Sequence, residues 1–142
     1  MDLSTEYLGL ALKNPIVASS SPLTWGVESA KALQRAGVAA IIMPSLFEEQ
    51  IEHEEMATHE LMMQGTELSP EARGFFPEMQ NYATGPDKYL RLIGDAKRAL
   101  SVPVIASLNG TSPGRWVESA RRIEAAGASA LELNIYAIPT DP

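Results

Sequence analysis

A chain of 142 residues with 45% hydrophobic and 20% charged side chains is long enough for one globular domain with a buried core. Its net charge of -7, without any basic cluster, makes nucleic acid and anionic membranes poor partners, and no apolar run approaches the roughly 18 residues that cross a bilayer. Cysteine is absent, which excludes disulfides, thiolate metal sites and cysteine catalysis and fits a cytoplasmic protein.

The amino-terminal part of the chain predicts a hairpin followed by a strand, a helix and a second strand. Residues 4–13 read as a small β-hairpin with Gly9 at its bend. Residues 16–19 then form a short buried strand. A helix is expected over residues 27–36, and the uninterrupted apolar run 39–43 predicts a strand that is covered on both faces.

The middle of the chain predicts a helix and a long loop. Ser45 and Glu48 have the spacing of a capping box, which predicts a helix over residues 46–63. Residues 65–85 contain several turn signals and read as a loop. A loop of this length inside a compact domain is often functional.

The carboxyl-terminal part returns to regular alternation of helix and strand. Residues 86–100 predict a helix with proline in its first turn, and residues 103–108 predict a third strand. Ser112-Pro113 is expected to begin a helix that ends at Ala126, and residues 131–135 form the fourth strand.

An internal repeat supports a parallel α/β fold. Val27-Glu28-Ser29-Ala30 recurs as Val117-Glu118-Ser119-Ala120, and in both copies Ala-Gly follows before a short apolar strand. Glycine can adopt the left-handed conformation that ends a helix. Parallel strands joined by helical crossovers occur both in open doubly wound sheets and in (β/α)8 barrels.

The hairpin favours the barrel, because it could close the bottom of one. A full barrel needs about 250 residues, and this chain supplies roughly four strands. We therefore expect an α/β fold in which residues 1–142 form a single partial domain, the N-terminal half of a TIM barrel preceded by a short β-hairpin.

Candidate binding residues lie at the carboxyl ends of the predicted strands, where such folds place their active sites. These ends are residues 18–20, 43–45, 107–110 and 134–136, and Glu132 shares one side of its strand with Asn134. The residues at the four strand ends are small, polar and uncharged, which suits a planar heteroaromatic ligand better than a metal or a multiply charged substrate. The alternative is that these serines and asparagines only form hydrogen bonds with the backbone of the turns in which they lie.

Other chemistry-bearing residues point to no site. His53 and His59 are surrounded by glutamates, but Ala57 stands where the zinc-protease spacing requires the second histidine, so we expect a solvated acidic helix face and no metal. No glycine pattern matches a dinucleotide or phosphate loop. Trp25 and Trp116 occupy equivalent places near the starts of the repeated helices and are expected to be packing residues.

Several segments, in this order and spacing, carry a family likeness. The segments are Tyr7-Leu8-Gly9-Leu10, residues 13–19, Ala36-Gly37, residues 103–107 and residues 131–134. Together they resemble the first half of dihydroorotate dehydrogenases. Residues 45–51 look like the divergent subgroup called dihydroorotate dehydrogenase-like proteins.

The resemblance implies an FMN-binding (β/α)8 barrel that oxidises dihydroorotate to orotate in pyrimidine biosynthesis. It implies proton abstraction from the substrate and hydride transfer to the flavin. The positions that it assigns to cofactor binding are Ala18, Ser19, Ser20, Ser45, Ser107 and Asn134. Asn134 matches the asparagine that closes the family's fourth strand, near flavin and substrate.

The chain departs from the family at three positions. Pro44 stands where the family has a flavin-contacting lysine, and Ser107 where it often has asparagine. Ala137 stands at the position of the catalytic base, a cysteine or serine in the family, and alanine cannot take a proton. No catalytic residue is therefore assigned.

Two functions remain open from the sequence. The first is an FMN-dependent oxidoreductase with a small-molecule substrate. The alternative is a truncated, non-catalytic half-barrel that binds a small molecule or a partner. An open half-barrel exposes apolar strand edges and helix faces, so a homo-oligomer is expected.

Overall fold

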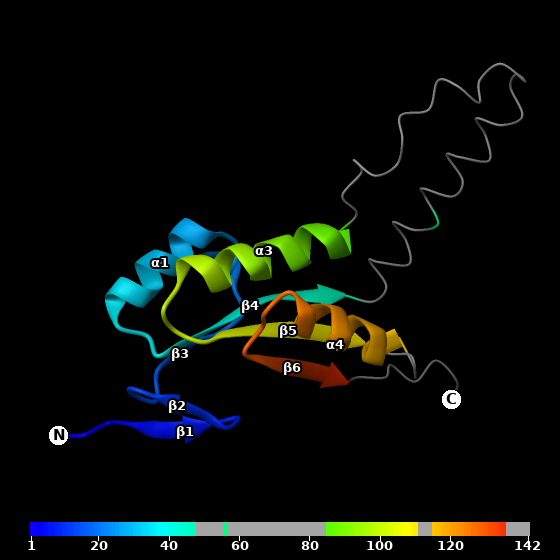
Figure 1. Ribbon diagram of the computed structural model, residues 1–142. Coiled ribbons are helices and arrows are strands. Elements are labelled where there is room, and N and C mark those ends of the chain that lie inside the picture. The colour runs from blue at the N-terminus through cyan, green and yellow to red at the C-terminus, as the bar shows by residue number, and fades with distance from the viewer. Residues whose placement is uncertain (48–55, 57–84, 111–114, 136–142) are drawn as a thin grey trace, which may run out of the picture.

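Four parallel strands form the central sheet, and they lie in the order β3-β4-β5-β6 (Figure 1). The computed structural model describes residues 1–47, 56, 85–110 and 115–135. The strands are β3 (Val17–Ala18), β4 (Ala40–Phe47), β5 (Val104–Gly110) and β6 (Ala130–Ile135). The α-helices in the described ranges are α1 (Val27–Ala36), α3 (Gly85–Ala99) and α4 (Arg115–Ala125). Every strand predicted from the sequence is therefore present, and so are the helices predicted at 27–36, at 86–100 and before Ala126.

The predicted hairpin is confirmed as strands β1 (Thr5–Tyr7) and β2 (Leu10–Leu12), which pair antiparallel. Its two-residue turn has positive φ at both positions, 54° at Leu8 and 71° at Gly9. Such a turn matches the right-handed twist of the two strands it joins. Glycine takes this conformation at no cost, whereas Leu8 is held there by the pairing on either side.

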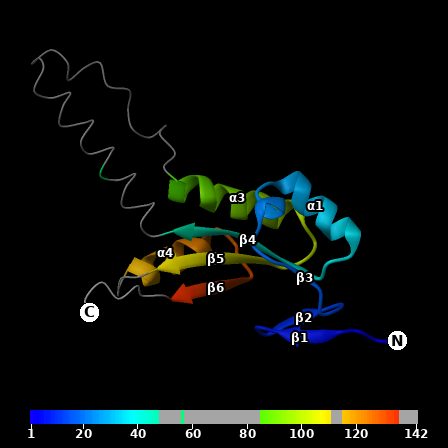
Figure 2. The same ribbon diagram turned by 180° about the vertical axis from the view of Figure 1, so that it is seen from behind.

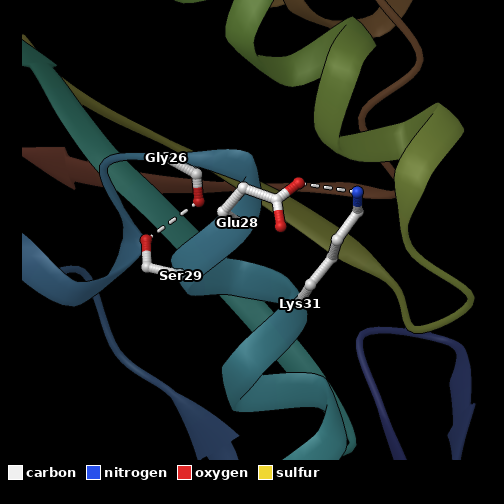
Figure 3. Close-up of polar contacts among 4 residues, drawn as sticks. All are labelled: Gly26, Glu28, Ser29 and Lys31. Carbon is white, nitrogen blue, oxygen red and sulfur yellow. Dashed lines mark hydrogen bonds and ion pairs between the residues drawn. The ribbon is translucent and has the colours of Figure 1, made fainter.

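Helix α1 begins without a capping side chain, because its N-cap residue is Gly26. Figure 3 shows the contacts of its first turn: Ser29 Oγ donates to the Gly26 carbonyl at 3.0 Å, and Lys31 Nζ lies 2.8 Å from Glu28 Oε1. The Lys31 ammonium lowers the pKa of the exposed Glu28 carboxyl through a hydrogen bond and through charge. The acidic side chain also lies where the helix dipole favours negative charge.

Both helices of the repeat end in the same way. Gly37 after α1 and Gly127 after α4 have φ of 107° and 97°. The glycine N–H bonds the carbonyl three residues back, and the next N–H bonds the carbonyl five residues back, in each copy. This pair of bonds is a Schellman motif. The glycine stops predicted from the repeat are therefore confirmed.

Strand β4 corrects the prediction for the middle of the chain. The sequence placed the end of this strand at Met43 and a capped helix from Leu46, but β4 continues through Pro44 to Phe47. The register against β5 shifts between Ile42 and Ser45, so Pro44, which has no N–H to donate, lies in a bulge. Of the predicted helix beyond residue 47 only Met56 is described, and it is helical. The predicted loop lies outside the described residues up to residue 84.

The helices cover one face of the sheet, as both views indicate (Figures 1 and 2). Ala30 of α1, Ile93 of α3 and Ile123 of α4 belong to one buried cluster with side chains from β4 and β5. The buried strand members of this helix-side cluster alternate along each strand, except across the bulge in β4: Ile41, Met43 and Leu46 in β4, and Val104, Ala106 and Leu108 in β5. Alternation by two places the residues between them on the opposite face.

A second buried cluster lies on that opposite face and joins the hairpin to the sheet. Leu12 of β2 packs with Ala40 and Ile42 of β4 and with Ile105 of β5. The hairpin therefore covers the part of this face where the strands begin. The four strands follow one another in sequence order, whereas a doubly wound sheet reverses its order at a switch point and carries helices on both faces.

The tryptophan prediction is correct at one position and wrong at the other. Trp116 is half-buried against the helix-side cluster, but Trp25 is 68% exposed. Thr24 takes the buried place at this turn instead, with its hydroxyl 2.9 Å from the Ser21 carbonyl that accepts from it.

Among the described residues, no helix combines the length and the apolar character that crossing a membrane requires.

Candidate functional site

A group of polar side chains lies beyond the hairpin, on the face of the sheet opposite the described helices α1, α3 and α4. Ile105 belongs to this face, so Ser107 and Asn109 of β5 belong to it by alternation. On β6, Ala130 faces the same way, and Glu132 and Asn134 follow it at intervals of two. Polar side chains thus replace apolar ones on this face toward the carboxyl ends of the strands.

Hydrogen bonds connect these side chains into one network across three strands. Ser45 Oγ of β4 lies 2.8 Å from Ser107 Oγ, which donates to Glu132 Oε1 at 2.9 Å. Asn134 Nδ2 donates to Asn109 Oδ1 at 2.8 Å and lies 3.3 Å from Ser107 Oγ and 3.4 Å from Glu132 Oε1. We call these five residues the strand-end network. It places one carboxylate, two hydroxyls and two amides in contact.

Exposure within the strand-end network rises from its centre to its edge. Ser107 has no exposed surface, and Ser45, Asn109 and Glu132 are half-buried. Asn134 is exposed. A ligand on this face would therefore touch Asn134, with Asn109 and Glu132 next to it, whereas Ser107 connects the others from beneath.

Tyr89 of α3 supports the centre of the network from the opposite face. Its hydroxyl accepts from the Ser107 N–H at 2.9 Å and donates to the Ser107 carbonyl at 3.1 Å. Ser107 is paired with Ser45 directly after the bulge in β4, so Tyr89 contacts β5 beside this irregularity. Burial raises the pKa of Tyr89 to about 12, although the backbone bond to Ser107 works against that rise, so the hydroxyl keeps its proton at neutral pH.

Three of the six predicted cofactor-binding residues come together in the structure: Ser45, Ser107 and Asn134. Ser45 lies inside its strand and not after it, because β4 extends further than the sequence indicated. Ser107 lies inside β5, as the predicted strand 103–108 had placed it.

The other three predicted residues lie at the end of β3, and no described hydrogen bond joins them to the network. Strand β3 pairs with β4 at Val17–Ala40 and Ala18–Ile41, before the bulge that carries Ser45. Ala18 packs against the helix-side cluster, Ser19 is exposed and Ser20 is half-buried. Their part in a cofactor site stays a prediction.

Asn109 was a strand-end candidate but not one of the six predicted cofactor-binding residues, and Glu132 and Tyr89 were in neither set. The strand period of two could have identified Asn109 and Glu132, since each lies two residues from a predicted cofactor-binding residue on the same strand and therefore on the same face. Tyr89 gave no such signal, because its contact is with the backbone of a residue on another element.

Further predictions fall on residues that the structure does not describe. His53 and His59 lie there, as does Ala137 at the base position implied by the family resemblance. Within the described ranges, no three histidine, cysteine, aspartate or glutamate side chains gather as metal ligands would.

These features define a parallel α/β protein with a polar face at the carboxyl ends of its strands. No protein-family model matches the chain. Two curated proteins are similar to it along nearly its whole length. One, from Aeropyrum pernix, is described as dihydroorotate dehydrogenase A (fumarate) and is 28% identical over 134 residues. The other, the catalytic subunit of dihydroorotate dehydrogenase B (NAD(+)) from Endomicrobium trichonymphae, is 25% identical over 146 aligned positions.

Each alignment covers 94% of this chain and 41% of the relative. The resemblance to dihydroorotate dehydrogenases expected from the sequence motifs is therefore confirmed, and the chain spans about two fifths of the length of these relatives.

Proposed function

We propose that this chain forms the first four β/α units of a (β/α)8 barrel in an FMN-dependent oxidoreductase that resembles dihydroorotate dehydrogenase. The reaction is the oxidation of dihydroorotate to orotate in pyrimidine biosynthesis. The observation that carries the proposal is the strand-end network, which lies at the carboxyl ends of parallel strands in a chain similar to two dihydroorotate dehydrogenases. Active sites of parallel α/β folds lie at this end of the sheet.

Three features of the described residues support the barrel. The strands follow one another without reversal, the helices cover one face, and the hairpin lies on the other face where the strands begin. In a closed barrel that second face becomes the interior. The network then lies at the mouth of the barrel and the hairpin at its bottom.

The residues of the network suit a flavin ring. The ring presents carbonyl oxygens and an N–H group along its edge, and these need donors and an acceptor in close proximity. Asn109 and Asn134 supply amide groups, each of which carries both a donor and an acceptor, beside the carboxylate of Glu132. When bound, FMN supplies the acceptor for a hydride from the substrate. The chain's own residues orient the ring through Asn134 and Asn109, and Ser107 and Glu132 hold the Asn134 amide in place.

The alternative function is a binding module without redox chemistry. Ala137, at the position of the family's catalytic base, favours this alternative because alanine accepts no proton. Both functions use the same face of the sheet. Reduction of the bound flavin by the substrate distinguishes them.

The test is an FMN titration followed by visible absorption spectroscopy, with the 142-residue chain and with any longer product that its gene encodes. We expect flavin binding that Asn134→Ala weakens about tenfold, because the loss of a ligand hydrogen bond worth about 1.4 kcal/mol changes affinity by that factor. Glu118→Gln on the exposed side of α4 is the matched control and leaves binding unchanged.

Anaerobic addition of dihydroorotate then bleaches the flavin bands if the chain is the oxidoreductase. Flavin binding without bleaching would support the binding module and overturn the redox proposal. Absence of flavin binding in every form would overturn the assignment of the cofactor.

A further inference from the structure

The hydrogen bonds of the strand-end network have only one consistent direction, and Glu132 sets it. A carboxylate can only accept, and an amide nitrogen can only donate. The single proton of Ser107 therefore goes to Glu132 Oε1, at 2.9 Å. Ser107 Oγ is then left with its lone pairs, so Ser45, 2.8 Å away, is the donor in the contact between the two hydroxyls.

The same logic decides which atom of Asn134 turns toward the network. Three oxygens surround its amide nitrogen within 3.4 Å: Asn109 Oδ1, Ser107 Oγ and Glu132 Oε1. With the amide reversed, the Asn134 oxygen would face the Glu132 carboxylate and a serine oxygen whose proton is already engaged. That arrangement places acceptors against acceptors.

The pair of asparagines cannot decide this orientation alone. Asn109 and Asn134 could each donate to the other, because every amide carries both a donor and an acceptor. Glu132 breaks this symmetry, since it offers no proton. Asn134 therefore turns its carbonyl oxygen away from the network, and Asn109, whose oxygen accepts from Asn134, keeps its amide nitrogen for other partners.

We propose that Glu132 is a positioning residue that acts through Ser107 to hold Asn134 with its carbonyl oxygen toward the ligand. The exposed edge of the network then offers an acceptor from Asn134 beside a donor from Asn109. This pair is complementary to a ring edge in which an N–H group adjoins a carbonyl. The inference rests on the proposed function only for its choice of ligand, because the orientation of the amide can be measured without one.

Two variants of Glu132 separate position from charge. Glu132→Gln keeps an acceptor oxygen for Ser107 and Asn134 but carries no charge, whereas Glu132→Met keeps the length of the side chain and removes the acceptor. Ser107→Ala removes the connecting hydroxyl and leaves Glu132 in place. Glu118→Met is the matched control, since it makes the same chemical change at an exposed position on α4, a helix that covers the opposite face of the sheet.

The first readout is NMR of the Asn134 side-chain amide, identified by its disappearance in Asn134→Asp. We expect one amide pair in the parent chain, in Glu132→Gln and in Glu118→Met. In Glu132→Met and Ser107→Ala we expect a shifted or doubled pair with hydrogen exchange about fivefold faster, as the loss of one hydrogen bond implies. Circular dichroism confirms that each variant is folded.

The second readout is FMN affinity by flavin fluorescence. Glu132→Met and Ser107→Ala are expected to weaken binding about tenfold, and Glu132→Gln to stay within about threefold of the parent. Unchanged amide signals in Glu132→Met would overturn the inference. Equal losses in Glu132→Gln and Glu132→Met would overturn it as well, because charge and not position would then be the cause. Absence of FMN binding in the parent would refute the proposed cofactor, and the amide signals would still decide the role of Glu132.

Discussion

Replacing Tyr89 by phenylalanine removes the hydroxyl that joins α3 to the centre of the sheet. The ring is 7% exposed and keeps its packing in the variant, so the change is confined to one oxygen. The Ser107 N–H and carbonyl, bonded to this oxygen at 2.9 and 3.1 Å, lose that partner inside the protein. An unsatisfied buried group costs about 1–3 kcal/mol, so we expect the free energy of unfolding to fall by about 2 kcal/mol.

The pKa of Tyr89 adds a pH dependence to this prediction. Burial raises it from 10.0 to about 12, so the folded state holds the proton over a range in which the unfolded state releases it. The stabilisation is fully present below pH 10 and is lost as the pH rises through 12. At about 1.4 kcal/mol for each pH unit, the loss approaches 3 kcal/mol for the parent and is absent in Tyr89→Phe.

Urea unfolding followed by circular dichroism at pH 7, 9, 10 and 11 measures both effects. The unfolding curves of the two proteins should converge as the pH rises, because only the parent is destabilised through Tyr89. Tyr7→Phe is the control, since Tyr7 is 46% exposed, and it should match the parent at every pH. Equal stability of Tyr89→Phe and the parent at pH 7, or a constant difference up to pH 11, would refute the reasoning.

Three further predictions concern other contacts. Gln34→Ala should lower the free energy of unfolding by about 1 kcal/mol in urea, because Gln34 Oε1 accepts from Ser101 N at 2.7 Å and from Val102 N at 3.2 Å. Gln34→Glu keeps an acceptor at this position and should therefore match the parent in the same assay. Gly110→Ala should lower the free energy of unfolding by about 1–3 kcal/mol in the same assay, since the added Cβ would lie 2.6 Å from Trp116 Cδ1. An equal loss in a Trp116→Ala background would argue against this clash. The chain is expected to self-associate through edge strand β6, where Leu133 and Ile135 are 38% and 66% exposed. Ile135→Lys should shift the sedimentation profile toward the monomer, and an unchanged profile would exclude this surface as the interface.

The elements predicted correctly are those that depend on neighbouring residues. The Leu8-Gly9 turn and the helix stops at Gly37 and Gly127 follow from backbone preferences that act within a few residues. The prediction failed at β4, where a capping pattern at Ser45 indicated a helix. Pairing with β5 and the bulge at Pro44 override that local signal. These contacts join residues far apart in the chain, so the capping pattern contained no information about them.

The same distinction between local and long-range contacts applies to the candidate site. The alternation of Glu132 and Asn134, and the presence of polar residues near strand ends, can be read from the sequence because a strand has a period of two. Only the tertiary structure brings Ser45 to Ser107 across 62 residues, and only it connects Ser107 to Tyr89 through the backbone. The sequence by itself determined the turns, the helix ends and the two faces of each strand, since these are set by local geometry. Strand register and packing decided which side chains meet on the face opposite the described helices. Both depend on contacts across the whole sheet and not on neighbouring residues alone.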